Sequence, residues 1–355
     1  MGRDMRYGVV IHGPEVIDLG IAAKVLDELE TLGDVEATIG GAMGVAALID
    51  AGLEDRVKIK GRQRVSDALV EMDRKNDEVI LLNASKTPVS GQTFGQMVVS
   101  RVINRLNVPL VQIDDGFYIC WKSPLRPVTA SLIRSMKLKE APPSTISKPS
   151  PYRRVISGVE IGENVWIDGI VVGKAIDEVV EFRLVKGELA YSGLEPKEHG
   201  IEKLSITDLS KALIRSGSVR RTTGAGGESR IRATGNRIIL IDHRAEDALF
   251  RGHNIKAAVS VGDDTTRIAT SLLARLGVPV IGIVDGDEDG ICMDREAAEG
   301  SIRLVLQPGN DDQLGAIVRE KIFRGQDEMI YDGTIGELTS KIKYLAGDKI
   351  RSIVR

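Results

Sequence analysis

Acidic residues follow three apolar runs in the C-terminal third of the chain. The runs are Ile238–Ile241, Ala257–Val261 and Val278–Val284. They are followed by Asp242, by Asp263 with Asp264, and by Asp285 with Asp287. Apolar runs separated by helical patterns are typical of parallel strands buried on both faces, and ligands bind beyond the carboxyl ends of such strands. The sequence therefore predicts that these carboxylates gather at one sheet edge.

A packed group of carboxylates repels itself unless a cation neutralises it. Oxygen ligands of this kind suit Mg2+ or Mn2+. We therefore predict a divalent metal site at Asp242, Asp285, Asp287 and Asp289. Two other interpretations stay open. The Asp- and Gly-rich run could be a solvated turn. It also has the alternating aspartates of a calcium loop, but without the helical flanks of an EF-hand.

The run Asp285-Gly286-Asp287-Glu288-Asp289-Gly290 follows two strand–helix units and resembles the Toprim domain of primases, topoisomerases and related nucleases. The primase version of that domain often reads Asp-Gly-Asp-x-x-Gly. The resemblance implies that Asp285 and Asp287 hold Mg2+. It places the Toprim glutamate at position 242, where this chain has aspartate, one methylene shorter, and places His243 where the family usually has glycine. Asp242 would then ligate the metal or move a proton.

The same resemblance implies a further acidic residue shortly after position 242, which Glu246 or Asp247 could supply. Among the histidines, His243 is the candidate for catalysis because it adjoins Asp242. We therefore predict Asp242, His243 and Glu246 as catalytic residues.

The whole chain also resembles an uncharacterised family of conserved archaeal proteins, found chiefly in methanogens. The segments Val10–Pro14 and Lys86–Gly95 carry this resemblance. It implies a source and no particular chemistry.

A glycine- and arginine-rich segment, Ser218–Arg232, directly precedes the acidic unit. Glycines allow a close approach of the backbone, and arginines bind phosphate in a bidentate manner, so Arg220 and Arg221 are predicted phosphate ligands. The segment lacks the Gly-Lys-Ser/Thr ending of a Walker loop. A flexible hinge with solvated charges is the alternative.

A second candidate site follows the strands expected in the N-terminal part. His12 and Gly13 lie between a strand and a helix, at the ligand-facing turn of such a sheet. Gly41 begins a helix whose N–H groups could bind an anion, and Ser85 with Lys86 follows a third strand. Together they predict a pocket for a small anion or a nucleotide. Alternatively, the tight turns need glycine for backbone reasons alone.

The elements that must position these residues read as three parts. Residues 1–140 alternate strands and helices and predict a Rossmann-like, doubly wound, mostly parallel sheet. Residues 141–235 begin with the proline-rich linker Ala141–Tyr152 and continue as a small β-rich insert. Residues 236–355 form a Toprim-like α/β unit. The fold class is therefore α/β.

The amino-acid composition indicates which kinds of ligand the protein could bind. The net charge of −3, the pI near 6.0 and the 4% aromatic content favour a nucleotide-sized phosphate ligand over nucleic acid. Charged residues interrupt every apolar run, and the N-terminus lacks a signal peptide, so we expect a cytoplasmic protein without a membrane segment. Cys120 and Cys292 fit no metal or disulfide pattern. The oligomeric state stays open, a homo-oligomer included.

These observations lead to one leading function and two alternatives. The leading function is Mg2+-dependent phosphoryl or nucleotidyl transfer or hydrolysis on a nucleotide or nucleic acid. The first alternative is a non-catalytic nucleotide or cofactor sensor. The second is a small-molecule enzyme of archaeal cofactor metabolism that uses the N-terminal glycine loops. The substrate and the role of the β-rich insert are not evident from the sequence.

Overall fold

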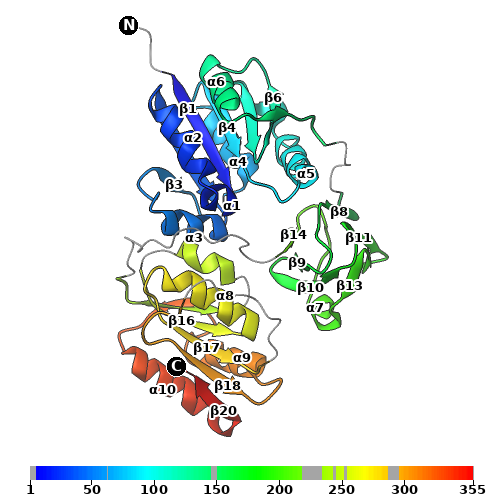
Figure 1. Cartoon of the computed structure of the whole chain (residues 1–355). Helices are drawn as coiled ribbons and strands as arrows, with labels where there is room; N and C mark the ends of the chain where they lie inside the picture. The colour runs from blue at the N-terminus through cyan, green and yellow to red at the C-terminus, as the bar shows by residue number, and fades with distance from the viewer. Residues whose placement is uncertain are drawn as a thin grey trace. The chain divides into compact units, whose positions relative to one another are not determined.

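The computed structural model describes residues 5–61, 63–144, 150–217, 234–242, 245–251, 254–286 and 296–354, without the side chains of residues 246, 247 and 251. The chain forms two compact units, residues 1–225 and 226–355. The fold is mixed α/β with four sheets among the described residues (Figure 1).

The first unit contains a seven-stranded sheet in the order β3-β2-β1-β4-β5-β6-β7. Its strands are β1 (Arg6–His12), β2 (Asp34–Gly40), β3 (Val57–Ile59), β4 (Glu78–Leu82), β5 (Leu110–Asp114), β6 (Phe117–Lys122) and β7 (Lys139–Glu140). Strands β1 to β5 pair in parallel, whereas β6 runs antiparallel to β5. The strand order reverses between β1 and β4, which is the switch point where doubly wound sheets bind ligands.

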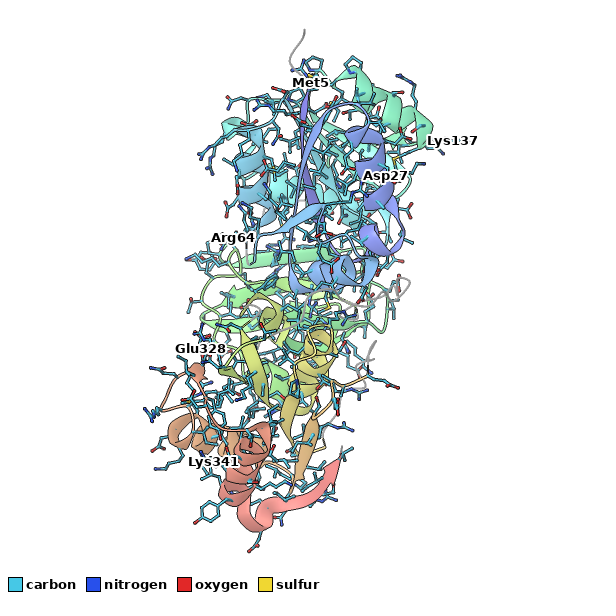
Figure 2. All side chains as sticks on the ribbon, turned by 90° about the vertical axis from the view of Figure 1, so that its left-hand side faces the viewer. Met5, Asp27, Arg64, Lys137, Glu328 and Lys341 are labelled. Carbon is cyan, nitrogen blue, oxygen red and sulfur yellow. The ribbon has the colours of Figure 1, made fainter. Side chains whose placement is uncertain are left out.

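Helices cover both faces of this sheet. They are α1 (Glu15–Asp18), α2 (Ile21–Glu30), α3 (Ala42–Ala51), α4 (Val65–Asp73), α5 (Pro88–Val99), the 3-10 turn η1 (Ile103–Arg105) and α6 (Pro127–Ser135). Val10 and Leu81 pack in one cluster with residues of α4 and α5. Their neighbours along the strands are also buried, and alternate strand residues point to opposite faces, so both faces carry a core. Charged side chains such as Asp27, Arg64 and Lys137 project from the surface (Figure 2).

Two helices differ from the pattern expected from the sequence. The single helix expected over residues 15–32 is interrupted at Gly20, whose φ of 74° is left-handed. The helix expected to begin near Gln92 begins at Pro88 instead. There Thr87 and Ser90 form a reciprocal capping box, and proline suits the first helical position.

The β-rich part of the first unit consists of two small sheets, in the orders β13-β10-β9-β14 and β12-β11-β8. The strands are β8 (Arg153–Ser157), β9 (Asn164–Ile167), β10 (Ile170–Ala175), β11 (Val179–Val185), β12 (Glu188–Ser192), β13 (Leu194–Pro196) and β14 (Ile214–Ser216), with one short helix, α7 (Glu198–Glu202). The hairpin predicted at Lys186-Gly187 is confirmed, and both residues have positive φ.

The helix expected over Asp208–Arg215 is wrong. The Asp208 carboxylate accepts hydrogen bonds from the Ser210 amide and hydroxyl, and the chain continues into β14. Local side-chain bonds of this kind favour a turn over a helix.

The second unit is built on a six-stranded sheet in the order β19-β15-β16-β17-β18-β20. The strands are β15 (Arg237–Ile241), β16 (Ile255–Val261), β17 (Val280–Val284), β18 (Ile302–Leu306), β19 (Glu328–Ile330) and β20 (Ile350–Val354). The helical elements are η2 (Ala245–Arg251), α8 (Asp263–Ala274), α9 (Asp311–Lys321), α10 (Ile335–Ala346) and η3 (Gly347–Lys349). Strands β15 to β18 pair in parallel, and the two edge strands are antiparallel.

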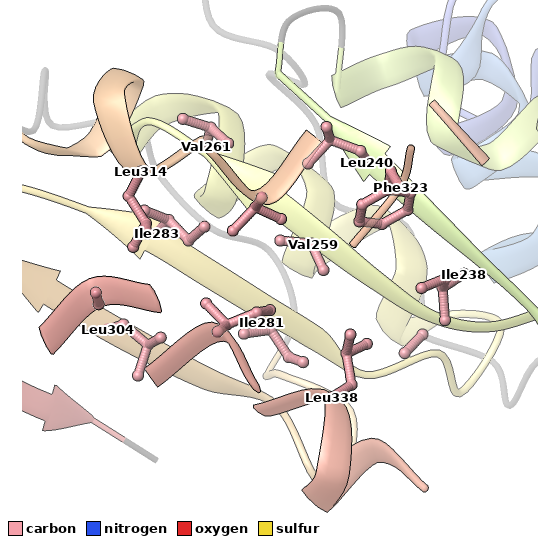
Figure 3. Close-up of a cluster of buried hydrophobic side chains, with 14 of the residues drawn as sticks. Ile238, Leu240, Val259, Val261, Ile281, Ile283, Leu304, Leu314, Phe323 and Leu338 are labelled. Carbon is pink, nitrogen blue, oxygen red and sulfur yellow. The ribbon is translucent and has the colours of Figure 1, made fainter. Parts of the chain in front are cut away.

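One buried cluster of the second unit lies between one face of this sheet and the helices α9 and α10. Ile281 and Leu304 of the sheet pack in one buried cluster with Leu314 of α9, Phe323 and Leu338 of α10 (Figure 3). This packing supports the parallel pairing of β17 with β18, beyond which Asp285 and Asp311 lie.

Glu71 of α4 provides a stability prediction that depends on pH. Its carboxylate accepts hydrogen bonds from Lys60 (2.9 Å), Lys75 (2.8 Å) and Gln63 (2.9 Å), and these bonds, that of Lys75 foremost, lower the pKa of Glu71 to about 2. A lowered pKa means that the stabilisation is present above the ordinary glutamate pKa and is lost as the pH falls through about 2.

We expect Glu71→Gln to lower the free energy of unfolding by about 1 kcal/mol at pH 7, a value reduced for solvent screening of partly exposed partners. The difference from the wild type should shrink between pH 4.5 and 2, as measured by urea unfolding. A difference that stays constant down to pH 2 would contradict the assignment.

Candidate functional site

Three carboxylates meet at the carboxyl ends of β16, β17 and β18. Asp263 is the first residue of α8, Asp285 follows β17, and Asp311 is the first residue of α9. Each offers an oxygen within 4.8 Å of the others. Asp263 is buried, whereas Asp285 and Asp311 are partly exposed. Consecutive parallel strands thus bring together residues far apart in the sequence.

Backbone hydrogen bonds hold this cluster in place. Asp263 Oδ2 accepts the amide hydrogens of Asp285 and Gly286, each at 3.0 Å. Asp285 Oδ2 accepts that of Gly309 at 2.5 Å, which ties the loop after β17 to the loop after β18. Within the described residues, the buried Asp285 Oδ1 has no hydrogen-bond partner. A buried acceptor without a donor costs free energy, which a bound cation would offset.

The donor set and the spacing suit a hard divalent cation. Mg2+ binds oxygens at about 2.1 Å, so opposite ligands lie about 4.2 Å apart, which is close to the 4.8 Å limit within which these three oxygens lie. Asp263 and Asp311 also begin helices that no side chain caps, and a helix N-terminus attracts anions such as phosphate. The edge therefore combines three carboxylate ligands with two helix N-termini.

The structure brings together only part of the predicted metal site. Asp242, expected in the cluster, instead accepts a hydrogen bond from Arg319 at 3.2 Å, and Arg319 also pairs with Asp327 at 2.9 Å. Asp285 lies where the sequence placed it, beside Asp263. The other predicted residues of this region lie outside the described part of the chain: Asp287, Asp289, His243, the Glu246 side chain, Arg220 and Arg221. Their roles stay predictions.

Sequence reasoning missed Asp311. Leu306 ends an apolar strand, and Gly309-Asn310-Asp311 then begins a helix. Val261-Gly262-Asp263 shows the same order of strand, glycine turn and helix-initiating aspartate. This repeated pattern is the signal that could have identified Asp311.

The predicted N-terminal site is built around a buried hydrogen-bonded chain. His12 ends β1, and its Nδ1 lies 2.9 Å from Asn83 Oδ1 just beyond β4. Asn83 Nδ2 donates to Asp114 at the end of β5, at 2.8 Å. Burial lowers the pKa of His12, although the hydrogen bond with Asn83 and the nearby Glu15 and Asp114 carboxylates oppose this shift. The neutral imidazole is therefore the favoured form at neutral pH.

Two glycines of α5 make room for this chain. A Cβ on Gly91 would lie 2.5 Å from Asp114 Oδ2, and one on Gly95 would lie 1.8 Å from Gln112 Oε1. Any larger residue at either position would displace the buried groups. The glycines at one-turn spacing thus let α5 lie directly against side chains of β5 and β6.

The remaining residues predicted for this site have structural partners. The Ser85 hydroxyl donates to Asp114 at 2.7 Å, and the Lys86 ammonium pairs with Glu163 of the β-rich part and donates to Ser216 Oγ. Gly13 and Gly41 both have φ of 84° in the turns after β1 and β2. The structure thus places all four near the sheet edge, but Ser85 and Lys86 donate to carboxylates of this chain.

Comparison with known proteins places the chain in a family. A family model described as "uncharacterized protein conserved in archaea (DUF2117)" matches residues 9–326. The chain belongs to this archaeal family. The match extends over both units, from β1 with His12 to the loops that carry Asp263, Asp285 and Asp311.

One relative within this archaeal family is the uncharacterized protein MJ0065 of Methanocaldococcus jannaschii. It is 36% identical over 336 residues, which cover 90% of this chain and 92% of the relative. The family resemblance expected from the sequence is therefore confirmed, with a methanogen among its members. No solved structure matches the chain. Among the described residues, no helix has the length and apolar character needed to cross a membrane.

Proposed function

We propose that the protein carries out Mg2+- or Mn2+-dependent phosphoryl or nucleotidyl transfer or hydrolysis on a nucleotide-sized substrate. The observation that carries this proposal is the convergence of Asp263, Asp285 and Asp311 within 4.8 Å at the ends of three adjacent parallel strands. The buried Asp285 oxygen without a donor among the described residues supports it further.

The proposal retains the Toprim resemblance over residues 238–290 with one change. Asp263 takes the place beside Asp285 that the sequence assigned to Asp242. In this scheme Asp263, Asp285 and Asp311 would hold the cation. Asp287 and Asp289, predicted as ligands from the sequence, lie outside the described residues. A bound cation would neutralise charge on the phosphoryl oxygens and orient the attacking group.

The chain's own groups would position the substrate and the proton. The N-termini of α8 and α9 would attract the phosphate. Asp242 would accept the proton of the attacking group, with its carboxylate oriented by Arg319 at 3.2 Å. The net charge of −3 favours a nucleotide over a nucleic acid, because a large polyanion would be repelled.

The test is hydrolysis of a panel of nucleotides and short oligonucleotides with Mg2+, Mn2+ or EDTA. We expect metal-dependent turnover that Asp285→Asn lowers by about 100-fold or more, the size typical of removing one electrostatic stabiliser. Asp312→Asn is the matched control, because it removes an exposed charge next to Asp311 but outside the three. Turnover that is equal in EDTA, or unchanged in Asp285→Asn, would refute the proposal.

A further inference from the structure

The buried chain Asp114–Asn83–His12 spans the switch point of the first unit and is not used by the proposed function. Asp114 is fully buried and accepts hydrogen bonds from five donors: Asn83 Nδ2, the Ser85 amide and hydroxyl, Gln112 Nε2 and the Asp115 amide. Both of its oxygens are therefore acceptors. Trp121 in turn donates to Gln112 Oε1, which fixes the orientation of that amide.

This arrangement determines where the proton of His12 lies. The Asp114 carboxylate can only accept hydrogen bonds, so the NH2 group of Asn83 must point towards it. The carbonyl oxygen of the same amide therefore points towards His12. That oxygen can only accept, and His12 Nδ1 at 2.9 Å must therefore donate. Neutral imidazole carries one N–H, so Nε2 bears the lone pair. Among the described residues, none is hydrogen-bonded to Nε2.

The surroundings favour a ligand that donates a hydrogen bond. Carboxylates of Glu15 and Asp114 act on His12, and the Phe94 ring stacks on it with centroids 4.0 Å apart. Lys86, which the sequence suggested as an anion ligand, is nearly buried in its pair with Glu163. An anion at Nε2 would thus meet a lone pair near the Glu15 carboxylate, with its expected cation already paired.

Position along the sheet supports a ligand here. His12 pairs in register with Gly40 of β2, and β4 flanks the other side of β1. A Cβ on Gly41 would meet no atom within 4 Å, so the turn after β2 leaves open space. Ligands of doubly wound sheets bind in this region, between the strands where the order reverses.

We propose that the first unit contains a second ligand site, in which His12 Nε2 accepts a hydrogen bond or a proton from the hydroxyl group of a neutral small molecule. Asn83 and Asp114 are positioning residues that act through His12. The site would serve either binding of a hydroxyl compound or general-base activation of its oxygen. It is independent of the metal cluster of the second unit.

The experiment is 15N NMR of the full-length protein with labelled histidines, assigned through His12→Gln. We expect His12 to show a protonated Nδ1 and an unprotonated Nε2 at pH 7. Phenol, a neutral hydroxyl probe, should move the Nε2 resonance towards its protonated position. Inorganic phosphate at equal concentration should not.

Asn83→Ala tests the positioning role. It should release His12 into a mixture of tautomers and weaken the response to phenol. Asn83→Asp should keep Nδ1 protonated, because its carboxyl group shares a proton with Asp114 on one side and still presents an acceptor to His12 on the other. If a variant fails to fold by circular dichroism, the wild-type tautomer and probe titrations decide alone. A His12 with its proton on Nε2, a response to phosphate and not phenol, or no response to phenol would each overturn the proposal.

Discussion

Asp285→Asn is expected to make the metal-free protein more stable and to abolish its stabilisation by Mn2+. Two carboxylates within 4.8 Å of each other repel by about 3 kcal/mol or more at an effective dielectric constant of ~20. Partial exposure of Asp285 and Asp311 reduces this, so the gain on removing one charge should be about 1 kcal/mol. The amide of asparagine can still accept the Gly309 N–H, so little is lost in exchange.

When the metal is present, we expect the wild type to be more stable than Asp285→Asn. A cation that binds only the folded state adds about 2.7 kcal/mol when its concentration is 100 times its dissociation constant. The wild type should gain this stabilisation, and Asp285→Asn should gain almost none because one charged ligand is missing. Urea unfolding with EDTA and with increasing Mn2+ measures both effects in one series.

Two controls define this experiment. Asp312→Asn should retain the wild-type response to Mn2+, because its carboxylate is not one of the three that converge. Ca2+ in place of Mn2+ tests selectivity, since Ca2+ prefers more ligands at longer distances. If Asp285→Asn destabilises the metal-free protein and leaves the Mn2+ response intact, the cluster is a loop-closing structural feature and no metal centre.

Lys86→Met is expected to destabilise the protein by about 3–5 kcal/mol. The Lys86 and Glu163 side chains are each only 12% exposed, and the ammonium is paired with that carboxylate and with Ser216 Oγ at 3.1 Å. Removal of the Lys86 ammonium leaves the buried Glu163 carboxylate with too few hydrogen-bond donors. That carboxylate still accepts a hydrogen bond from the Glu160 amide at 3.0 Å. The cost arises from that uncompensated charge more than from the lost attraction.

The double variant Lys86→Met/Glu163→Gln separates these contributions. It removes both charges and keeps an acceptor for the Glu160 amide, so most of the stability should return. Lys58→Met is the matched surface control, because Lys58 is 64% exposed in its pair with Glu36 and should cost less than about 1 kcal/mol. A cost below about 1 kcal/mol for Lys86→Met would mean that the lysine is exchangeable and available to a ligand.

Local patterns in the sequence were sufficient for several elements. The alternation of apolar strands and amphipathic helices predicted β1, β2, β4 and β5 of the first unit and β15, β16 and β17 of the second. The sequence also predicted a last helix near residues 335–346, where α10 lies. These elements could be predicted because the spacing of apolar residues along a short segment indicates whether one or both of its faces are buried.

Other elements depended on contacts that the sequence does not display. Asp208–Arg215 has a helical pattern, but bonds from Ser210 to Asp208 and pairing with β9 make a turn and a strand. Gly20 divides the helical pattern of residues 15–32 because its φ of 74° is left-handed. In both cases a single local bond or dihedral angle outweighed a weak average propensity.

By itself, the sequence determined the α/β class, the archaeal family and the concentration of carboxylates at strand ends. Only the tertiary structure decided which carboxylates meet. Asp263 and Asp311 join Asp285 because β16, β17 and β18 are adjacent, while Asp242 turns to Arg319 of α9. Packing between distant segments determines which strands are adjacent and which residues form ion pairs. These long-range contacts cannot be predicted from the residue types along one short segment.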